Sequence, residues 1–152
     1  MDDERGGLYL EDVKAGQTFT SETYVMDSPR LKAFAAEFDP QPFHIDETAA
    51  KESVFQGLAA SGWHTAAVAM RLLTTSGLRF ANGILGLGAE VSWPRPTRPG
   101  DALHLDTEIV EITPSRSKPD RGIVTIRSMM LNQNGETVYV LKAKLLVPKR
   151  PR

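Results

Sequence analysis

The hydrophobic pattern of this chain changes its period near Gly83, and that change limits the possible folds more than any other feature. Before it, apolar residues recur three and four positions apart, the spacing of a helix with one face in a core. After it, apolar and polar residues alternate, as in strands with one buried face. A helical first half followed by consecutive strands predicts an α+β fold with an antiparallel sheet.

The first part of the chain predicts one strand and one helix. Alternating and β-branched residues indicate a strand near Thr18–Met26. Ser28 and Pro29 match an N-cap followed by proline in the first turn of a helix. The apolar stripe of this helix consists of Leu31, Phe34, Ala35 and Phe38. Pro40 and Pro42 end it, because the residue before a proline is disfavoured in the helical region.

A second helical region precedes the change of period. Asp46 can cap a short helix near Glu47–Glu52, and a linker with the sequence FQGLAASG follows. The most helical segment comes next, Gly62–Thr75, with Gly77 as its C-terminal stop. Its expected core face consists of Trp63, Ala66, Ala67, Met70 and Leu73, broadened by Val68 and Leu72. Because the segment is alanine-rich and apolar over most of its circumference, we expect a buried helix.

Four strands are expected after Gly83, with turn sequences between them. They lie near Leu85–Trp93, Ala102–Ile112, Gly122–Asn132 and Thr137–Val147. Asn134-Gly135 is the strongest hairpin signal among the turns. A curved antiparallel sheet wrapped around the long central helix would bury the apolar faces of both, which is the hot-dog fold. At 152 residues, the chain is expected to form one such domain over residues 1–152.

Composition excludes several classes of function. The net charge of -1 provides no field of one sign to attract nucleic acid or an anionic membrane. The absence of cysteine rules out disulfides, thiolate nucleophiles and cysteine zinc sites. The three histidines lack zinc-ligand spacing, so no metal is expected. The N-terminus lacks a signal-peptide pattern and no apolar run approaches the roughly 20 residues of a membrane span, so a cytoplasmic protein is expected.

The segment FDPQPFHID, residues 38–46, holds an acid and an imidazole on a proline-rich loop. Asp39 and His44 can each exchange a proton near neutral pH when their surroundings shift the pKa modestly. Because Asp39 follows a helix C-terminus, where the helix dipole disfavours a carboxylate, we expect its pKa to be raised. The prolines would hold the two side chains at a fixed separation. Alternatively, Asp39 only hydrogen-bonds its own turn, and Asp46 needs no role beyond its helix cap.

The start of the long helix, Ser61-Gly62-Trp63, is a second candidate site. A helix N-terminus presents unpaired N–H groups and partial positive charge, and glycine lets a ligand approach the backbone closely. A thioester carbonyl directed at the Gly62 N–H would have negative charge on its oxygen stabilised, as in an oxyanion hole. The sequence leaves open whether Gly62 serves only close packing. It also leaves open whether Trp63 and Met70 belong to the core or to the wall of an acyl pocket.

These residues resemble a known family. DPQPFHID followed by FQGLAASGWHT is similar to the MaoC-like dehydratases, the (R)-specific enoyl-CoA hydratase group. The shared pattern is an Asp, a Pro-x-His, an Asp two residues later, and a glycine that opens the central helix, here Gly62, 18 residues after His44. The later VSWPRPTRPGD is also similar, and the resemblance covers roughly residues 10 to 147. Two positions differ, because Gln41 stands where the family often has Asn and Ser61 where it often has His.

The resemblance implies a homodimeric hot-dog enzyme that hydrates enoyl thioesters, or dehydrates (R)-3-hydroxyacyl thioesters, of coenzyme A or acyl carrier protein, with no further cofactor. Asp39 and His44 would hold one water between them. In the hydration direction His44 would take the proton of the water and Asp39 would deliver one to the α-carbon. The two groups form a coupled pair, so either assignment stays open. The Gly62 N–H would receive the carbonyl, and Ser61 and Trp63 would contact the substrate.

Two rival functions remain open at this point. A hot-dog thioesterase would hydrolyse the thioester, but such enzymes usually place a carboxylate on the central helix, and no Asp or Glu occurs between Gly62 and Gly77. A non-catalytic acyl-CoA binding module would not need both Asp39 and His44. Loop cations that could reach the phosphates of coenzyme A are Arg95, Arg98, Arg116, Lys118 and Arg121. The exposed edge of so small a sheet also predicts edge-to-edge pairing of two copies.

Overall fold

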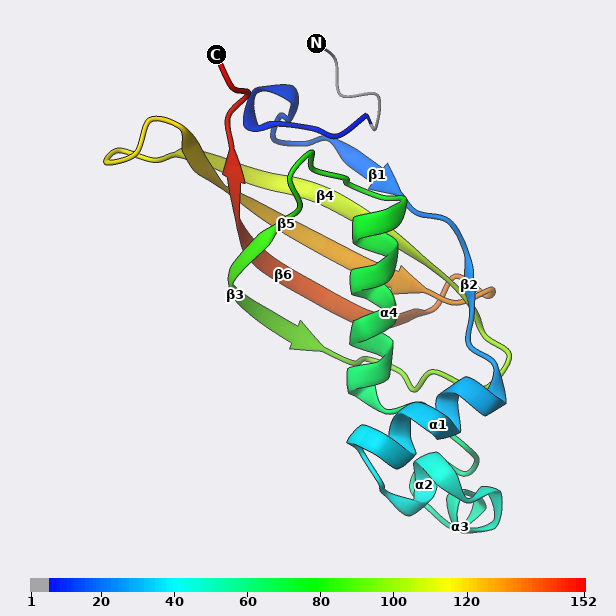
Figure 1. The fold of residues 1–152 in the computed structure, drawn as a ribbon. Helices are drawn as coiled ribbons and strands as arrows, with labels where there is room; N and C mark the ends of the chain where they lie inside the picture. Colours follow the sequence, from blue (N-terminus) through cyan, green and yellow to red (C-terminus); the bar gives the residue numbers. More distant parts are fainter. Residues whose placement is uncertain (1–5) are drawn as a thin grey trace.

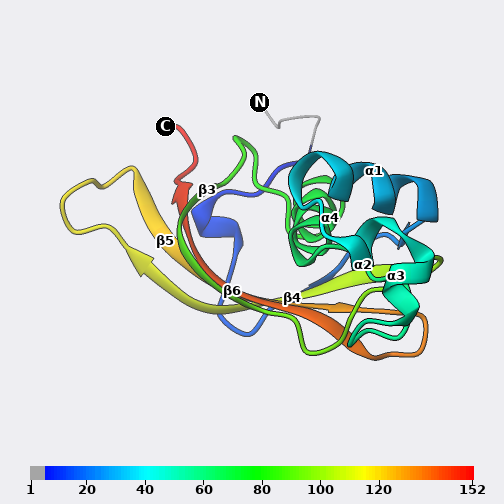
Figure 2. The ribbon, with the colours of Figure 1, turned by 90° about the horizontal axis from the view of Figure 1, so that it is seen from below.

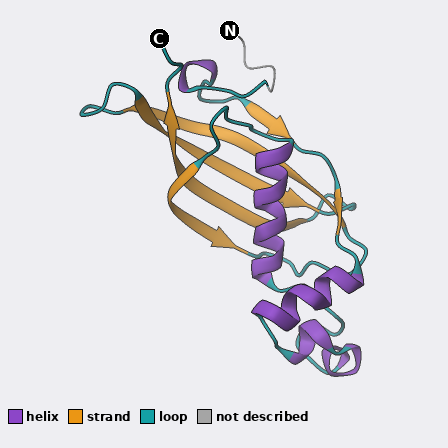
Figure 3. Ribbon diagram, viewed as in Figure 1, coloured by secondary structure: helices purple, strands orange, loops and turns teal. Residues whose placement is uncertain are grey.

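A computed structural model describes residues 6–152 of the chain. The helical elements are a 3₁₀ turn η1 (Leu10–Asp12) and the helices α1 (Ser28–Phe38), α2 (Pro42–Ile45), α3 (Glu47–Lys51) and α4 (Gly62–Thr75). The strands are β1 (Thr18–Thr20), β2 (Tyr24–Val25), β3 (Leu85–Ser92), β4 (Ala102–Pro114), β5 (Arg121–Leu131) and β6 (Thr137–Pro148). Along the chain these helices precede the four long strands, as the change of period predicts. Figure 3 shows the helices and the strands in separate colours.

The sheet is antiparallel and runs in the order β1-β4-β5-β6-β3, with β2 also paired to β4. β4, β5 and β6 follow one another as hairpins, whereas β3 pairs with β6 at one edge (Figure 1). The sheet curves, α4 lies over its concave face, and α1, α2 and α3 gather near the N-terminal end of α4 (Figure 2). The expected α+β hot-dog fold, with a sheet wrapped around a long helix, is confirmed.

One face of α4 packs on the sheet, and the opposite face is open in the single chain. The buried residues of the helix are His64, Thr65, Val68, Ala69, Leu72 and Leu73. Trp63 is 60% exposed, Met70 is 46% exposed and Ala67 is also exposed, so the expected core face is wrong at these three positions and the helix is not buried all around. The error has a physical reason. Apolar residues and alanine occur on both faces of this helix, so its pattern does not mark the face that the sheet covers.

Three local features differ from the expected elements. The strand expected over Thr18–Met26 is divided into β1 and β2, because the Ser21 hydroxyl, in place of a backbone carbonyl, accepts from the Leu105 N–H at 2.7 Å. Asp27 caps α1 in place of Ser28, since its carboxylate accepts from the Arg30 N–H at 2.8 Å. The proline-rich loop contains a helical turn, α2, that starts at a proline, the residue suited to a first helical position.

No helix within residues 6–152 has both the length and the apolar character needed to cross a membrane.

Candidate active site

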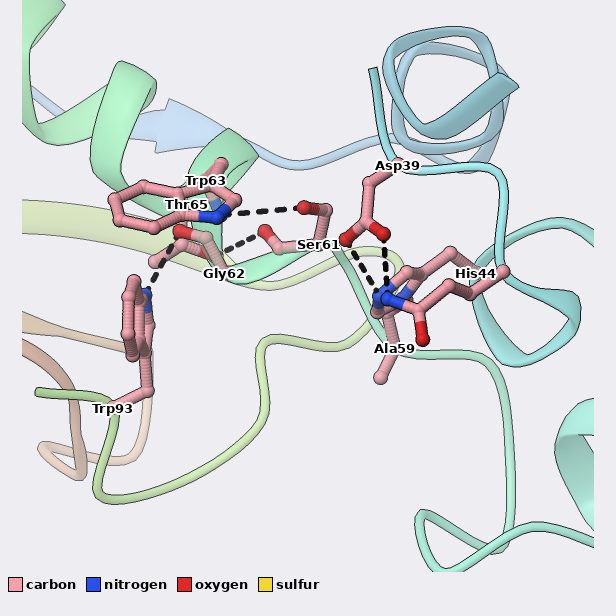
Figure 4. Close-up of polar contacts among 9 residues, drawn as sticks. Asp39, His44, Ala59, Ser61, Gly62, Trp63, Thr65 and Trp93 are labelled. Atoms are coloured by element: carbon pink, nitrogen blue, oxygen red, sulfur yellow. Dashed lines mark hydrogen bonds and ion pairs between the residues drawn. The ribbon is translucent and has the colours of Figure 1, made fainter. Parts of the chain in front are cut away.

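Three parts of the chain meet around one cavity of about 460 Å³ at the N-terminal end of α4. Asp39 comes from the end of α1, His44 from α2, and Gly62 and Trp63 from the first turn of α4 (Figure 4). The loop after β3 forms the remaining wall. Ser61 is fully buried next to these residues. The fold thus brings together the five residues that the sequence singled out.

Asp39 and His44 are in direct contact. Oδ2 of the carboxylate lies 3.2 Å from Nε2 of the imidazole, and the two side chains are 18% and 5% exposed. A water in line between the two atoms would need a separation of roughly 5 Å. The expected water between them therefore does not fit, and a water that contacts both groups must lie to one side of the pair, in the cavity.

The ring of His44 is oriented by a backbone carbonyl on its other side. Its Nδ1 lies 2.6 Å from the carbonyl oxygen of Ala59 (Figure 4). A carbonyl oxygen can only accept, so Nδ1 carries a hydrogen in both the neutral and the protonated imidazole. Nε2, which faces Asp39, is therefore the atom that gains or loses a proton. The contact is favourable when the pair holds one proton, because an unprotonated Nε2 and a carboxylate are both acceptors.

The pKa of the Asp39 carboxyl is lowered, so the expectation of a raised pKa is wrong. Partial burial acts to raise the pKa of this carboxyl, but side-chain hydrogen bonds from Ser61 and Gln41, together with the charge of His44, outweigh burial. The Gln41 amide donates to Asp39 Oδ1 at 2.5 Å. Direct contacts of this kind exceed the effect of a helix terminus. Asp39 is consequently a carboxylate at neutral pH.

The first turn of α4 leaves one backbone donor without a partner among the described residues. Ser61 caps the helix, since its Oγ accepts from the Trp63 N–H at 3.3 Å and its carbonyl accepts from the N–H groups of His64 and Thr65 at 3.0 and 3.1 Å. Within residues 6–152, no acceptor takes the Gly62 N–H, and Gly62 lines the cavity. A donor at a helix N-terminus, where partial positive charge accumulates, suits an oxygen that develops negative charge.

Trp93 packs against Gly62 and is a site residue that sequence reasoning missed. Its Nε1 donates to the Gly62 carbonyl at 2.8 Å (Figure 4), and a Cβ on Gly62 would meet Trp93 Cε2 at 2.8 Å. Close packing therefore does require glycine here, whether or not its N–H also binds a ligand. Trp63 stands nearly perpendicular to Trp93, with ring centres 5.1 Å apart, and belongs to the cavity wall. The only signal for Trp93 was its place in the WPRP segment that follows a strand.

The five cationic side chains considered for coenzyme A do not share one surface. Only Arg95 lines the cavity, where it forms an ion pair of 2.9 Å with Glu136. The guanidinium group of Arg98 donates hydrogen bonds to backbone carbonyls. The other three lie around the β4–β5 turn, which Figure 1 places far from the N-terminal end of α4. Among the described residues, the cavity therefore offers a single arginine for a phosphate.

The chemistry available to the site is proton transfer next to a carbonyl. An acid, an imidazole and a backbone donor converge on the cavity, which also has aromatic walls suited to an apolar group. His64 is buried in α4, and His104 lies 3.6 Å from Asp106 on the sheet. In the part of the chain that the structure describes, no three His, Asp or Glu side chains cluster closely enough to hold a metal.

Known proteins resemble this chain over most of its length. The model of the family described as MaoC like domain matches residues 12–129. A MaoC-like dehydratase from Rhodospirillum rubrum is 59% identical, with a TM-score of 0.94 over 96% of this chain and 100% of that one. The R-hydratase PhaJ1 from Pseudomonas aeruginosa is 25% identical, with a TM-score of 0.76 over 95% of this chain and 88% of that one. YdeM of Bacillus subtilis is 28% identical over 93% of this chain and 100% of its own length.

Proposed function

The chain belongs to the MaoC-like domain family, and from this premise we propose that it catalyses the reversible addition of water to a 2-enoyl thioester. The product is the (R)-3-hydroxyacyl thioester, with coenzyme A or acyl carrier protein as the carrier and no further cofactor. The observation that carries the proposal is the contact of 3.2 Å between Asp39 and His44, in a cavity that Gly62 also lines. The likeness to a MaoC-like dehydratase and an R-hydratase supports the same class of reaction.

The low pKa of Asp39 supports a proton assignment opposite to the one first expected. In the hydration direction, the Asp39 carboxylate takes a proton from the water beside the pair while the water oxygen bonds to the β-carbon. The alkene electrons move toward the thioester oxygen to form an enolate, and Nε2–H of His44 then delivers a proton to the α-carbon. Asp39 now holds a proton that His44 lacks, and transfer across their contact restores the pair. Dehydration follows the same steps in reverse.

The first turn of α4 stabilises the enolate in this mechanism. The Gly62 N–H donates to the thioester oxygen, and the loss of one such donor typically costs about 3 to 4 kcal/mol in the transition state. Ser61 contacts both the N-terminus of α4 and the Asp39–His44 pair, since its hydroxyl caps the helix and also hydrogen-bonds the Asp39 carboxylate. Trp63 contacts the acyl group from the cavity wall.

The same function includes a homodimer paired through β3. This strand hydrogen-bonds only to β6, so its outer edge has no partner strand among the described residues. Leu85 is 58% exposed and Leu87 is 52% exposed in the single chain. An apolar strand with a free edge favours pairing with another strand. A second copy across this edge brings its own helix or strands toward each cavity, so the site lies between subunits.

The loss of the enoyl-thioester absorbance band with crotonyl-CoA tests the proposed reaction, and chiral separation of the product tests its (R) configuration. Asp39→Asn and His44→Gln should each lower kcat by at least about 100-fold. Asp46→Asn is the matched control from the same loop, because Asp46 only caps α3 through the N–H groups of Thr48 and Ala49. Hydration by Asp39→Asn at the wild-type rate would contradict the assignment, and release of free thiol would indicate a thioesterase.

A further inference from the structure

The guanidinium group of Arg98 binds backbone carbonyls, with no carboxylate as its ion-pair partner in residues 6–152. Its Nη2 donates to the Phe55 carbonyl at 2.5 Å, and its Nη1 donates to the carbonyls of Gly57 and Leu58 at 3.0 and 3.2 Å. These three acceptors lie on one segment, residues 53–60, which connects α3 to α4 without regular secondary structure. A charged side chain from the loop after β3 therefore holds a segment about 40 positions earlier in the chain.

The residue next to these acceptors is Ala59, whose carbonyl orients His44. Other contacts also hold the segment: Ala59 N–H donates to the Phe43 carbonyl at 3.3 Å, Ala60 N–H donates to the Thr97 carbonyl at 2.9 Å, and the Phe55 ring lies 5.1 Å from the Phe43 ring. No other donor in residues 6–152 reaches the three carbonyls that Arg98 binds. Gln56, between two of them, has a positive φ of 56°, a conformation that a side-chain-bearing residue rarely keeps unless its surroundings impose it.

Arg98 is itself well anchored. Its backbone N–H donates to Asp101 Oδ2 at 2.8 Å, and Gln133 Nε2 donates to the other oxygen of that carboxylate at 3.0 Å. Asp101 is buried. A guanidinium group presents several N–H donors in one rigid plane, whereas a lysine ammonium is a single point on a flexible stem. Three carbonyls that face one side chain therefore fit arginine and not lysine.

We propose that Arg98 is a positioning residue for His44. It fixes residues 55–58 so that the Ala59 carbonyl stays at hydrogen-bond distance from Nδ1, which in turn keeps Nε2 directed at Asp39. The effect of Arg98 on the reaction rate rests on the proposed function. Its effect on the ring of His44 does not, and the two can be measured separately.

NMR of the imidazole N–H protons in ¹⁵N-labelled protein tests the structural half. The Nδ1–H signal of His44, assigned by its loss in His44→Gln, should be well resolved in the wild type because the carbonyl holds it. In Arg98→Met this signal should shift or disappear, while Arg121→Met should leave it unchanged. Arg121 is the matched control because its guanidinium pairs with Asp120 on the surface, away from the cavity. If Arg98→Met does not fold, Arg98→Lys provides the same comparison with a retained charge.

Steady-state kinetics with crotonyl-CoA test the catalytic half. A ring displaced by a fraction of an ångström should lower kcat by about tenfold to 100-fold in Arg98→Met, with a much smaller change in KM. Low concentrations of guanidinium ion should restore part of the rate in Arg98→Ala and none in His44→Gln. A folded Arg98→Met protein with an unchanged Nδ1–H signal would overturn the proposal. If the wild type hydrates no enoyl thioester, the proposed function fails, while the NMR comparison still decides the role of Arg98.

Discussion

The rings of Phe34 and His64 are stacked, with centres 4.5 Å apart and planes 7° from parallel. His64 is 6% exposed, and its Nδ1 has no hydrogen-bond partner among the described residues. Burial lowers the pKa of His64, and the nearby charge of Arg30 lowers it further. The contact between α1 and α4 therefore contains a neutral imidazole that is costly to protonate.

Replacement of His64 should change how stability depends on pH. Because the folded pKa lies below the unfolded one, the unfolded chain binds more protons, and stability falls as the pH drops below about 6.5, the ordinary histidine pKa. We expect His64→Phe, which keeps the stacking on Phe34, to remove most of this loss. Urea unfolding between about pH 7.5 and 5.5 measures it, with a slope of at most about 1.4 kcal/mol per pH unit for one group.

His104→Phe is the control for this comparison. His104 lies on the sheet with 33% of its side chain exposed, so His104→Phe removes one histidine without changing the contact between α1 and α4. If the free energy of unfolding changes with pH equally in the wild type and in His64→Phe, His64 does not gain a proton on unfolding between about pH 7.5 and 5.5.

Gly62 should tolerate no side chain while Trp93 is present. A Cβ would lie 2.8 Å from Trp93 Cε2, so Gly62→Ala must push the indole away or tilt the first turn of α4. We expect a loss of about 1 to 3 kcal/mol in the free energy of unfolding, measured with urea. The loss should shrink in the Trp93→Ala background, because that variant removes the ring. Gly77→Ala, beyond the other end of α4, is the control, since the nearest atom to a Cβ there, the Leu72 carbonyl oxygen, would lie 3.4 Å away.

Contacts that are local in sequence could be predicted. Gly135 has the positive φ of 74° that its hairpin turn needs, and the Asn132 carboxamide accepts from two N–H groups of that turn. Asp39 and His44 lie five positions apart, so the loop itself brings them together. The order of helices and strands follows from the period of the hydrophobic pattern, because each period is a local property of the chain.

Contacts between distant segments could not be predicted. Trp93 meets Gly62 across 31 positions, and Arg98 meets Phe55 across 43 positions. Ser61 provides one of the hydrogen bonds that reverse the expected pKa shift of Asp39, and no pattern in the loop sequence predicts this hydrogen bond. The open face of α4 depends on which side the sheet covers, a choice that an alanine-rich helix does not specify.

Asp39 should make the protein more stable at neutral than at acid pH. Its folded pKa lies below the unfolded value of about 3.9, so the stabilisation is complete above that value and is lost as the pH falls through the folded pKa. The difference in free energy of unfolding between the wild type and Asp39→Asn should therefore decrease from about pH 6 to about pH 2. Carboxyl ¹³C NMR should show a higher Asp39 pKa in Ser61→Ala, which loses one hydrogen bond to the carboxylate. An Asp39 pKa at or above its ordinary value in the wild type would contradict both expectations.

The free edge of β3 should control assembly and, through it, activity. Sedimentation should show a dimer for the wild type at micromolar concentration and a monomer for Leu87→Lys, because a charge in the middle of an edge strand opposes pairing. Val54→Lys is the control, since Val54 is more exposed but lies on the connection after α3, away from the sheet edge. If each cavity needs residues of the second copy, the Leu87→Lys monomer should also lose hydration activity while its circular dichroism spectrum stays that of the folded chain. A monomeric wild type that hydrates crotonyl-CoA would show that one chain forms the whole site.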